Sequence, residues 1–500
     1  MTGKRDLLLG LDVGTTATKA LAFDLEGHVV ASASQAYELL TPQPGWVEQD
    51  PEDLWAAVVQ TVREVTAKIG PSGRIVALSQ ASQGGTTIPV DTAGAPVHNA
   101  ISWMDGRGIA MRGLVAEALG PDYVETTSGW PLSGSLSLHH IAWLRHRRSD
   151  LFSAAARFRF VNDFIGERLC GRAMMNPSDA TMTQLLDIEH ARWDPVLLGY
   201  IGIDESGLSE MAPSGRAIGT ITADAALLLG LPRDTLVVNG AHDQYCAAVG
   251  TGVTEPGEVL LSCGTAWVVL AVPDSLEAGR AGGMALSCHA VEGRWGGIRS
   301  LGGVGASLEW LVSQVWRQGA GDDRPGIYRA LNAGAAEVPP GSRGLVFVPL
   351  SGGFHAGHRD GGFVRLTLAH TRDEMARAVM EGIAYELRRA LEEIRQGGVA
   401  IDRLTMVGGA AESSVWPRIV ADVTGVSVAV PEQRQAAAVG AAILAGVGAG
   451  CFTGPEEGVA AFGGDVWELS PDPRAAEVYN LAYGDYVGLC RALESARTKN

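Results

Sequence analysis

Residues 7–23 read Leu7-Leu8-Leu9-Gly10-Leu11-Asp12-Val13-Gly14-Thr15-Thr16-Ala17-Thr18-Lys19-Ala20-Leu21-Ala22-Phe23. Two apolar runs flank a polar turn, and this pattern predicts a β-hairpin. Gly14 lets the backbone approach an anion closely, and Asp12 is a ligand type that Mg²⁺ accepts. Hydroxyl donors and a positive charge come from Thr15, Thr16 and Lys19. The stretch therefore predicts a phosphate-holding turn, and an ordinary β-hairpin is the alternative interpretation.

The same pattern returns in the second half of the chain. Residues 258–272 form an apolar run, the turn Ser262-Cys263-Gly264-Thr265 and another apolar run. The order of three strands followed by a helix thus begins near residue 7 and again near residue 258. A duplicated domain explains this repeat, so we expect an α/β protein whose two Gly-Thr hairpins, the second with Gly264 and Thr265, face one cleft.

Length and composition limit the classes of protein that fit. A chain of 500 residues is too long for one core, and 46% hydrophobic with 19% charged residues indicates a globular protein. The net charge of -17 disfavours nucleic acid or an anionic membrane as the main partner. The longest apolar stretch, residues 436–452, is shorter than the roughly 20 residues that span a bilayer. No signal peptide and no C-x-x-C pair is evident, which favours reduced thiols and a cytoplasmic protein.

A candidate catalytic carboxylate follows a buried strand. Residues 235–238 read Thr-Leu-Val-Val, a buried strand, and the run Asn239-Gly240-Ala241-His242-Asp243-Gln244 comes next, before a helix of small residues. The carboxyl end of such a strand is where α/β folds place ligands. Asp243 is therefore a candidate for chemistry, and a helix cap is the alternative.

The segment 101–107 predicts a sugar-binding face. Trp103, Asp105 and Arg107 alternate, so in an extended segment they share one side. The indole would stack on the sugar and the charged groups would bind its hydroxyls. The alternative is a buried tryptophan beside a structural Asp105–Arg107 ion pair.

Two glycine- and alanine-rich segments suggest backbone contacts. Residues 404–413 read as a buried strand that opens into the turn Gly408-Gly409, where a base or ribose can lie against the backbone. Residues 436–442 have almost no side-chain bulk, which predicts close packing and suits a hinge between domains.

Taken in order, these motifs resemble those of the FGGY carbohydrate kinases, within the actin-like ATPase superfamily. The resemblance covers residues 6–450 and includes Gly45-Trp46-Val47-Glu48-Gln49-Asp50-Pro51, which is similar to the family's W-x-E-Q-x-P segment. It implies two ribonuclease-H-like domains around a central cleft. Residues 1–252 would form the sugar-binding side and residues 253–500 the ATP-binding side.

The resemblance also implies roles for individual residues. Asp243 would be the general base, and Asp12 would help to hold Mg²⁺. The ATP site would be formed by Asp12, Thr15, Thr16, Lys19, Gly264, Thr265, Gly305, Gly409 and Ser413. The sugar site would be formed by Gln83, Trp103, Asp105, Arg107 and Gln244. Phosphoryl transfer needs such charge neutralisation and positioning, and domain closure would exclude water.

Departures from the family pattern bear on the substrate. Gln83-Gly84-Gly85 stands where glycerol kinases carry an Arg-Glu pair after the glutamine, which argues against glycerol. Xylulokinases carry Met-His-Gly there, so the usual ketose contact is also missing. The family's Ser-Gly-Glu-Arg-x-Pro loop is replaced by residues 351–360. Its His355, His358 and Asp360 offer metal ligands in principle, and a polar rim loop is the favoured alternative.

The sequence thus predicts an ATP- and Mg²⁺-dependent kinase that phosphorylates a primary hydroxyl of a small sugar or polyol. A xylulose-like ketose is the first candidate. A kinase for another polyol or a deoxy-ketose, or a non-catalytic sugar-binding regulator of the same fold, are the alternatives. We expect no nucleic-acid or membrane partner, and the oligomeric state stays open, with a homodimer among the options.

Overall fold

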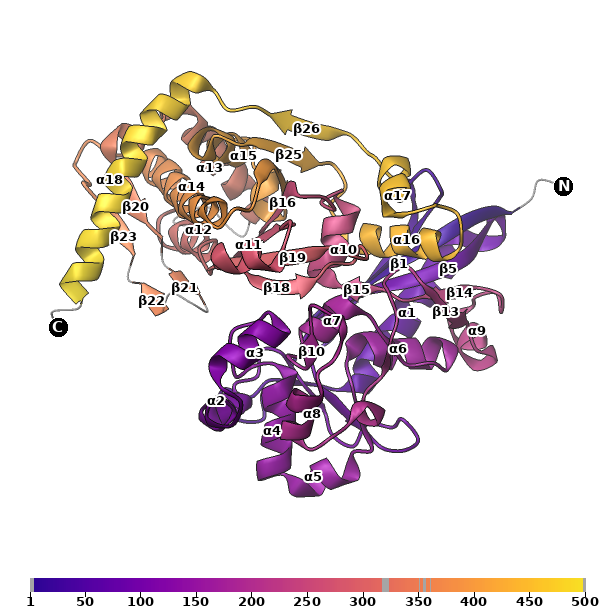
Figure 1. Ribbon diagram of the computed structural model, residues 1–500. Helices are drawn as coiled ribbons and strands as arrows, with labels where there is room; N and C mark the ends of the chain where they lie inside the picture. Colours follow the sequence, from indigo (N-terminus) through magenta and orange to yellow (C-terminus); the bar gives the residue numbers. More distant parts are fainter. Residues whose placement is uncertain (1–3, 317–322, 350, 354–356, 360, 498–500) are drawn as a thin grey trace. The chain divides into compact units, whose positions relative to one another are not determined.

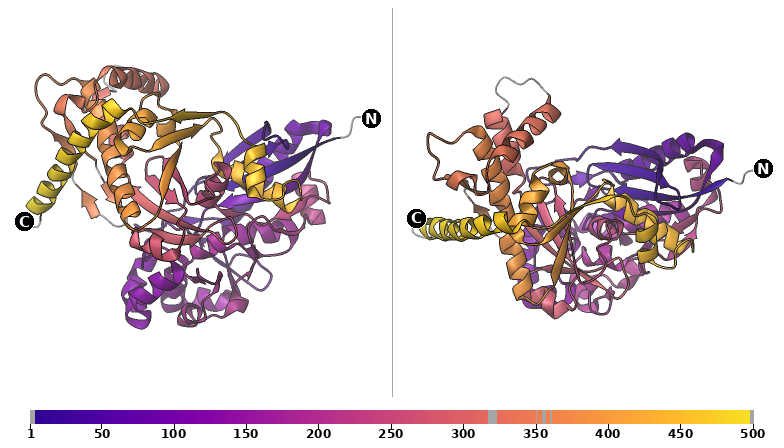
Figure 2. Two further views of the ribbon diagram at one scale, coloured as in Figure 1. Left: turned by 45° about the horizontal axis from the view of Figure 1, so that its top comes forward. Right: turned by 90° about the horizontal axis from the view of Figure 1, so that it is seen from above.

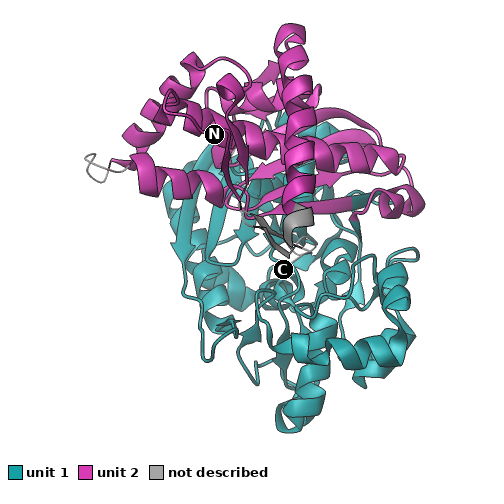
Figure 3. Cartoon of the chain, turned by 90° about the vertical axis from the view of Figure 1, so that its left-hand side faces the viewer, with its two compact units in different colours: residues 1–254, 285–296, 435–464 teal, residues 255–284, 297–434, 465–500 magenta. Residues whose placement is uncertain are grey.

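The computed structural model describes residues 4–316, 323–349, 351–353, 357–359 and 361–497. These residues form two compact units, which are described separately (Figure 3). Unit 1 comprises the chain up to residue 254 with 285–296 and 435–464, and unit 2 comprises 255–284, 297–434 and the chain from 465 onward. Unit 1 therefore includes two segments from the second half of the chain, residues 285–296 and 435–464. The division of the sequence between residues 252 and 253 stays a prediction.

The sheet of unit 1 has the strand order β13-β14-β5-β1-β2-β3, and β15 also pairs with β5. Its strands are β1 (Arg5–Val13), β2 (Ala17–Phe23), β3 (Val29–Ala36), β5 (Gly73–Ser82), β13 (Ala217–Thr220), β14 (Leu236–Val238) and β15 (Ala241–His242). β1 runs antiparallel to β2 and parallel to β5. The first hairpin is therefore confirmed, and it lies at the centre of the sheet.

Helix α1 (Pro51–Ile69) follows the meander of β1, β2 and β3. Asp50 begins the helix, because its Oδ1 accepts a 2.9 Å hydrogen bond from the Glu52 backbone N–H. Leu54, Val58 and Val62 are fully buried and belong to the same core cluster as the strands β1 and β2. Capping and apolar periodicity thus agree on where this helix begins and which face it buries.

Helix α16 (Ala436–Gly448) packs very closely within unit 1, beside β1 (Figure 1). A Cβ at Gly10 would lie 1.9 Å from the Ala438 carbonyl oxygen. A Cβ at Gly440 would lie 1.8 Å from the carbonyl oxygen of Cys246 in α10 (Asp243–Gly250). The small residues of this segment are therefore required for close contact with both a strand and a helix.

The remaining elements of unit 1 surround this sheet or form a separate helical group. Helices α2, α4, α5 and α8 gather away from the sheet (Figure 1). The elements are β4 (Glu48–Gln49), β6 (Ile88–Val90), β7 (Ala100–Ile101), α2 (Arg112–Leu119), α3 (Pro121–Ser128), α4 (Ser137–Arg147), α5 (Ser149–Ala154), β8 (Arg157–Arg159), α6 (Val161–Cys170), β9 (Met174–Met175), α7 (Pro177–Thr181), β10 (Leu186–Asp187), β11 (Arg192–Trp193), α8 (Pro195–Ile201), β12 (Glu210–Met211), α9 (Ala223–Leu229), β18 (Ala285–Cys288) and α17 (Pro455–Ala461).

The sheet of unit 2 repeats the topology of unit 1. Six of the seven strands of this sheet run in the order β19-β17-β16-β24-β25-β26: β16 (Gly257–Cys263), β17 (Trp267–Ala271), β19 (Trp295–Gly302), β24 (Ile401–Val407), β25 (Ser427–Pro431) and β26 (Val466–Leu469). β16 is antiparallel to β17 and parallel to β24, as β1 is to β2 and β5. The outer strands match in direction as well. The predicted duplication is therefore confirmed strand by strand.

Two long helices pack together in unit 2, α14 (Arg372–Gln396) and α18 (Pro473–Arg497). The views in Figure 2 show α18 as one continuous helix. The hydroxyl of Tyr479 on α18 bonds to Glu381 on α14 over 2.9 Å, and Arg377 donates to both. The other elements are α11 (Leu276–Ala281), α12 (Ala306–Leu311), α13 (Arg324–Glu337), β20 (Val346–Val348), β21 (Ser351–Gly353), β22 (Gly357–Arg359), β23 (Gly362–Val364) and α15 (Trp416–Thr424).

Within the described residues, no helix combines the length and the apolar character needed to cross a bilayer.

Candidate functional site

The first Gly-Thr turn, residues 14–16, joins β1 to β2 and carries several predicted site residues. Asp12 and Lys19 face each other across the hairpin, with Lys19 Nζ 3.6 Å from Asp12 Oδ2. Thr15 is half-buried and Thr16 is exposed at the tip. The turn therefore presents a carboxylate, an ammonium group and hydroxyls at one end of the central strand.

A ring of hydrogen bonds connects this turn to the predicted sugar-binding residues. The Trp103 indole N–H donates to Thr15 Oγ1 over 3.0 Å, and Gln49 Nε2 donates to the Thr15 carbonyl over 2.8 Å. Gln83 Nε2 donates to Gln49 Oε1 over 3.0 Å. Thr86 Oγ1 lies 3.4 Å from both Gln83 Oε1 and the Trp103 backbone N–H, which closes the ring. The structure thus brings together Thr15, Gln83 and Trp103.

Gln49 and Thr86 are members of this ring that sequence reasoning did not single out. Gln49 belongs to the W-x-E-Q-x-P segment, which carried a family signal without an assigned role. Thr86 is fully buried and shows no comparable signal in the sequence. Their amide and hydroxyl groups extend the neutral polar character of the site.

Asp243 is the first residue of α10, directly after β15. Its side chain is 31% exposed, so a solute can reach it. Burial raises the pKa of Asp12 from its ordinary value of 3.8 to about 6; Asp243 raises it further, and Lys19 opposes the shift. The two carboxylates are therefore close enough to repel each other. Gln244 lies in the first turn of the same helix and is half-buried.

A buried carboxyl that the sequence did not predict supports this region. Asp179 in α7 accepts hydrogen bonds at Oδ2 from Ser82 Oγ, over 3.0 Å, and from Asn176 Nδ2, over 2.7 Å. Burial raises the pKa of Asp179 to about 8, against the lowering effect of these two donors. In the sequence, Asn176-Pro177-Ser178-Asp179 predicts only a capped helix start, which hides the second role of the carboxyl.

The interpretation of residues 101–107 as an extended sugar-binding face is wrong. The segment turns at Trp103 and enters a 3₁₀ helix at Arg107, so its side chains do not share one side. Asp105 and Arg107 are buried and paired, with Arg107 Nε 2.8 Å from Asp105 Oδ1. Arg107 also donates to Glu48, over 2.7 Å. These two residues hold the loop around Val47, and of the three predicted residues only Trp103 reaches the surface, where it is 37% exposed.

The glycine turns of unit 2 lie close together. Gly264 and Thr265, between β16 and β17, are exposed. A Cβ at Gly305 would lie 2.2 Å from the Gly264 carbonyl oxygen, and a Cβ at Gly408 would lie 2.7 Å from the Cys263 carbonyl oxygen. The structure therefore assembles three turns that are far apart in sequence into one backbone surface.

Gly409 and Ser413 contribute differently to this surface. A Cβ at Gly409 would meet nothing within 4 Å, so the turn is open there. Ser413 is buried, and its Oγ donates to Asn332 Oδ1 over 2.8 Å and accepts from the Val415 and Trp416 backbone N–H groups. Its hydroxyl thus already serves to start α15.

The predicted metal-ligand loop is only partly covered by the structure. His355 and Asp360 lie outside the described residues, and for His358 only the backbone, in β22, is described. The loop therefore stays a prediction.

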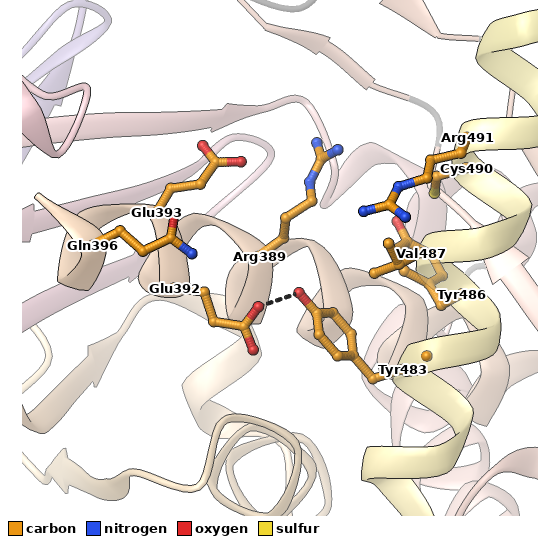
Figure 4. Close-up of a pocket in the computed structure, with 10 residues that line it drawn as sticks. Arg389, Glu392, Glu393, Gln396, Tyr483, Tyr486, Val487, Cys490 and Arg491 are labelled. Atoms are coloured by element: carbon orange, nitrogen blue, oxygen red, sulfur yellow. Dashed lines mark hydrogen bonds between the residues drawn. The ribbon is translucent and has the colours of Figure 1, made fainter.

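A separate hollow of about 640 Å³ lies between α14 and α18 in unit 2 (Figure 4). The side chains around it are already paired, since Tyr483 donates to Glu392 over 2.7 Å and Arg389 donates to Glu386 over 2.8 Å. None of the predicted site residues is among those that line it, so it is not part of the candidate site.

Comparison with known proteins adds to this geometry. Residues 7–250 match the N-terminal domain of the FGGY family of carbohydrate kinases, and residues 259–449 match its C-terminal domain. The gluconokinase of Bacillus subtilis (strain 168) is 30% identical over 98% of this chain and 97% of its own length. The xylulose kinase of the same organism is 27% identical over 96% of each chain.

Solved structures show the same architecture. The xylulose kinase from Rhodospirillum rubrum superposes with a TM-score of 0.89 at 29% identity, covering 98% of this chain and 99% of its own. The gluconate kinase from Lactobacillus acidophilus superposes with a TM-score of 0.87 at 25% identity, covering 99% and 100%. The predicted α/β fold with two domains of the actin-like ATPase type is therefore confirmed. By its sequence, its repeated sheet topology and these similarities, the chain belongs to the FGGY family of carbohydrate kinases.

Proposed function

We propose that this carbohydrate kinase transfers the terminal phosphoryl group of ATP to a primary hydroxyl of a small sugar or polyol, with a xylulose-like ketose as the first candidate. The observation that carries the proposal is the pair of carboxylates at the strand ends of unit 1, Asp12 and Asp243, which lie close enough for the charge of Asp243 to raise the pKa of Asp12. Asp12 is suited to bind a metal ion, and Asp243 is suited to accept a proton.

Asp243 is the proposed general base. It is reachable from solvent and is the first residue of helix α10. The carboxylate would accept the proton of the sugar hydroxyl as the oxygen–phosphorus bond forms. Such a base contributes about 10²–10⁴-fold in rate.

Asp12 is the proposed ligand of Mg²⁺. The donor set fits this ion, because two carboxylates lie near each other and Lys19, with Nζ 3.6 Å from Asp12 Oδ2, offsets part of their negative charge. When bound, Mg²⁺ would neutralise charge on the phosphates. Thr15, Thr16 and Lys19 would hold phosphate oxygens around it.

The ATP is proposed to bind on unit 2. Gly264 and Thr265 would contact phosphates through an exposed turn, and Gly305 and Gly409 would bring backbone close to the adenosine. Ser413 would support the site indirectly, because its hydroxyl fixes the turn that precedes α15.

The sugar is proposed to bind beside Gln83, Trp103 and Gln244 in unit 1. The polar groups of this part are amides, hydroxyls and an indole, which suit a neutral polyhydroxyl chain. A sugar acid such as gluconate is the second candidate, because of the similarity to gluconokinases. Its carboxylate would need a free cation, and Arg107 is already paired with Asp105 and Glu48.

The test is a coupled assay of ADP release across pentuloses, hexuloses, tetritols and gluconate. We expect the largest kcat/KM with a pentulose and a strict requirement for a divalent cation. Asp243→Asn should keep ATP binding and lose turnover by at least about 10²-fold. No sugar-dependent ADP release with any acceptor would contradict the proposal and favour a sugar-binding regulator.

The proposal also covers where the protein acts in the cell and whether it forms a dimer. The cytoplasm is the proposed location, because the proposed donor, ATP, is made and used there, and cell fractionation would test it. A homodimer stays a prediction that light scattering can check.

A further inference from the structure

His242 lies directly before Asp243, at the end of β15, and is 6% exposed. Its backbone N–H donates to Ser178 Oγ over 3.0 Å, and Ser178 in turn bonds to Asn176 over 2.7 Å. His242 pairs with Ser82 across the sheet. The backbone that leads into Asp243 is thus held from two sides by buried polar groups.

The imidazole of His242 contacts the Asp243 carboxylate, with Nε2 3.3 Å from Oδ1. At this distance the Nε2–H tautomer of a neutral imidazole can point its proton at the carboxylate, which only accepts hydrogen bonds. The other nitrogen, Nδ1, is buried and has no hydrogen-bond partner among the described residues. Burial lowers the pKa of His242, and Asp243 opposes that shift.

The ring has little freedom to move. A Cβ at Gly84 would lie 2.6 Å from His242 Cδ2, and the Tyr245 ring lies 5.8 Å away, centroid to centroid. The same Cβ would lie 2.6 Å from Met182 Cγ as well. A glycine at position 84 therefore provides the space that the ring occupies, and these neighbours restrict the rotation of the ring.

We propose that His242 is a positioning residue for Asp243: its Nε2–H holds Oδ1, so that Oδ2 is turned toward the hydroxyl to be phosphorylated. The inference rests on the proposed role of Asp243 as the base. In the reaction the hydroxyl proton goes to Asp243 while its oxygen forms the bond to phosphorus and the ADP oxygen leaves. The His242 proton stays on Nε2.

The first experiment compares His242→Leu, which removes the donor, with His242→Gln, which retains an N–H donor. Misplacement of a reacting group costs about 10²-fold, so we expect kcat to fall by one to two orders of magnitude in His242→Leu. The KM for the sugar should change less than twofold, and His242→Gln should recover most of kcat.

A second variant displaces the imidazole ring of His242 while His242 and Asp243 themselves stay unchanged. Gly84→Ala places a methyl group against His242 Cδ2 and should lower kcat in the same way. Gly113→Ala is the matched control, because a Cβ there meets nothing within 4 Å. Circular dichroism and ATP binding establish that each variant is folded, and Gly84→Ala supplies the answer if His242→Leu does not fold.

The outcomes separate this inference from the proposed function. Turnover retained in Asp243→Asn would overturn the base assignment and the inference together. An inactive Asp243→Asn with near-normal kcat in His242→Leu and Gly84→Ala would overturn the inference alone. A rise in sugar KM with unchanged kcat would also overturn it, because His242 would then bind substrate.

Discussion

The indole N–H of Trp103 donates a 3.0 Å hydrogen bond to Thr15 Oγ1, although the two residues are 88 positions apart in the sequence. Thr15 belongs to the proposed phosphate turn and Trp103 to the proposed sugar site. The bond therefore joins the two halves of the proposed reaction within unit 1.

Removing this bond should have a non-additive effect. Trp103→Phe keeps a ring without the donor, and Thr15→Val keeps the shape without the acceptor. Each variant should lose about 1 kcal/mol, the usual value of one hydrogen bond, and raise the KM for ATP about fivefold. The double variant should cost little more than either single variant, as a double-mutant cycle of urea unfolding and kinetics will measure. Additive losses would show that the two side chains act independently.

The Arg107 cluster should matter for stability and not for substrate affinity. Arg107→Met leaves Asp105 and Glu48 buried without their partner, so the free energy of unfolding should fall by about 3–5 kcal/mol. Urea unfolding measures this loss, and Arg148→Met, at an exposed ion pair with Asp150, is the control, which should leave the free energy of unfolding nearly unchanged. If Arg107→Met left the free energy of unfolding unchanged and raised the KM for the sugar tenfold, Arg107 would instead be a substrate-binding residue.

Gly409 offers a direct test of the proposed nucleotide surface. Gly409→Ala adds a methyl group in open space, so stability should not change while the KM for ATP rises roughly tenfold, as for a crowded contact. The KM for the sugar should stay constant. Gly408→Ala is the contrasting variant: its φ of 92° and the nearby Cys263 carbonyl predict a loss of stability. An unchanged ATP KM in Gly409→Ala would place the adenosine elsewhere.

Asp179 should give the protein a pH-dependent stability. Burial raises the pKa of Asp179 to about 8, so the folded state holds the proton more tightly than the unfolded chain does. This stabilisation is complete below about pH 4 and is lost as the pH rises through 8. One pKa unit corresponds to about 1.4 kcal/mol. As the pH rises from 5 to 8.5, the free energy of unfolding of Asp179→Asn should therefore increase by at least about that much relative to the parent protein.

Urea unfolding across this pH range measures the effect. The control is Asp150→Asn, because the pKa of Asp150 is lowered to about 2 by its hydrogen bond with Arg148, and its titration ends below pH 5. Parallel curves for the parent protein and Asp179→Asn would show that Asp179 is ionised in the folded state.

Local signals in the sequence account for the elements and for the repeat. The Gly-Thr turns at residues 14–16 and 264–266 can be recognised in the sequence because each has an apolar run on both sides. Asp50-Pro51 marks the start of α1. These features depend on neighbours in the chain, so period and capping rules suffice to predict them. The position of Asp243 after a buried strand belongs to the same class.

The tertiary structure alone decided which polar residues meet. Asp105 and Arg107 alternate in the sequence, but the turn at Trp103 buries both, and no periodicity rule reports that turn. Asp179 resembles part of a capped helix start until Ser82 is placed beside it, and the proposed role of His242 depends on the room that Gly84 leaves for its ring. These contacts join residues from separate strands and helices, and their energies depend on burial, which local sequence does not encode.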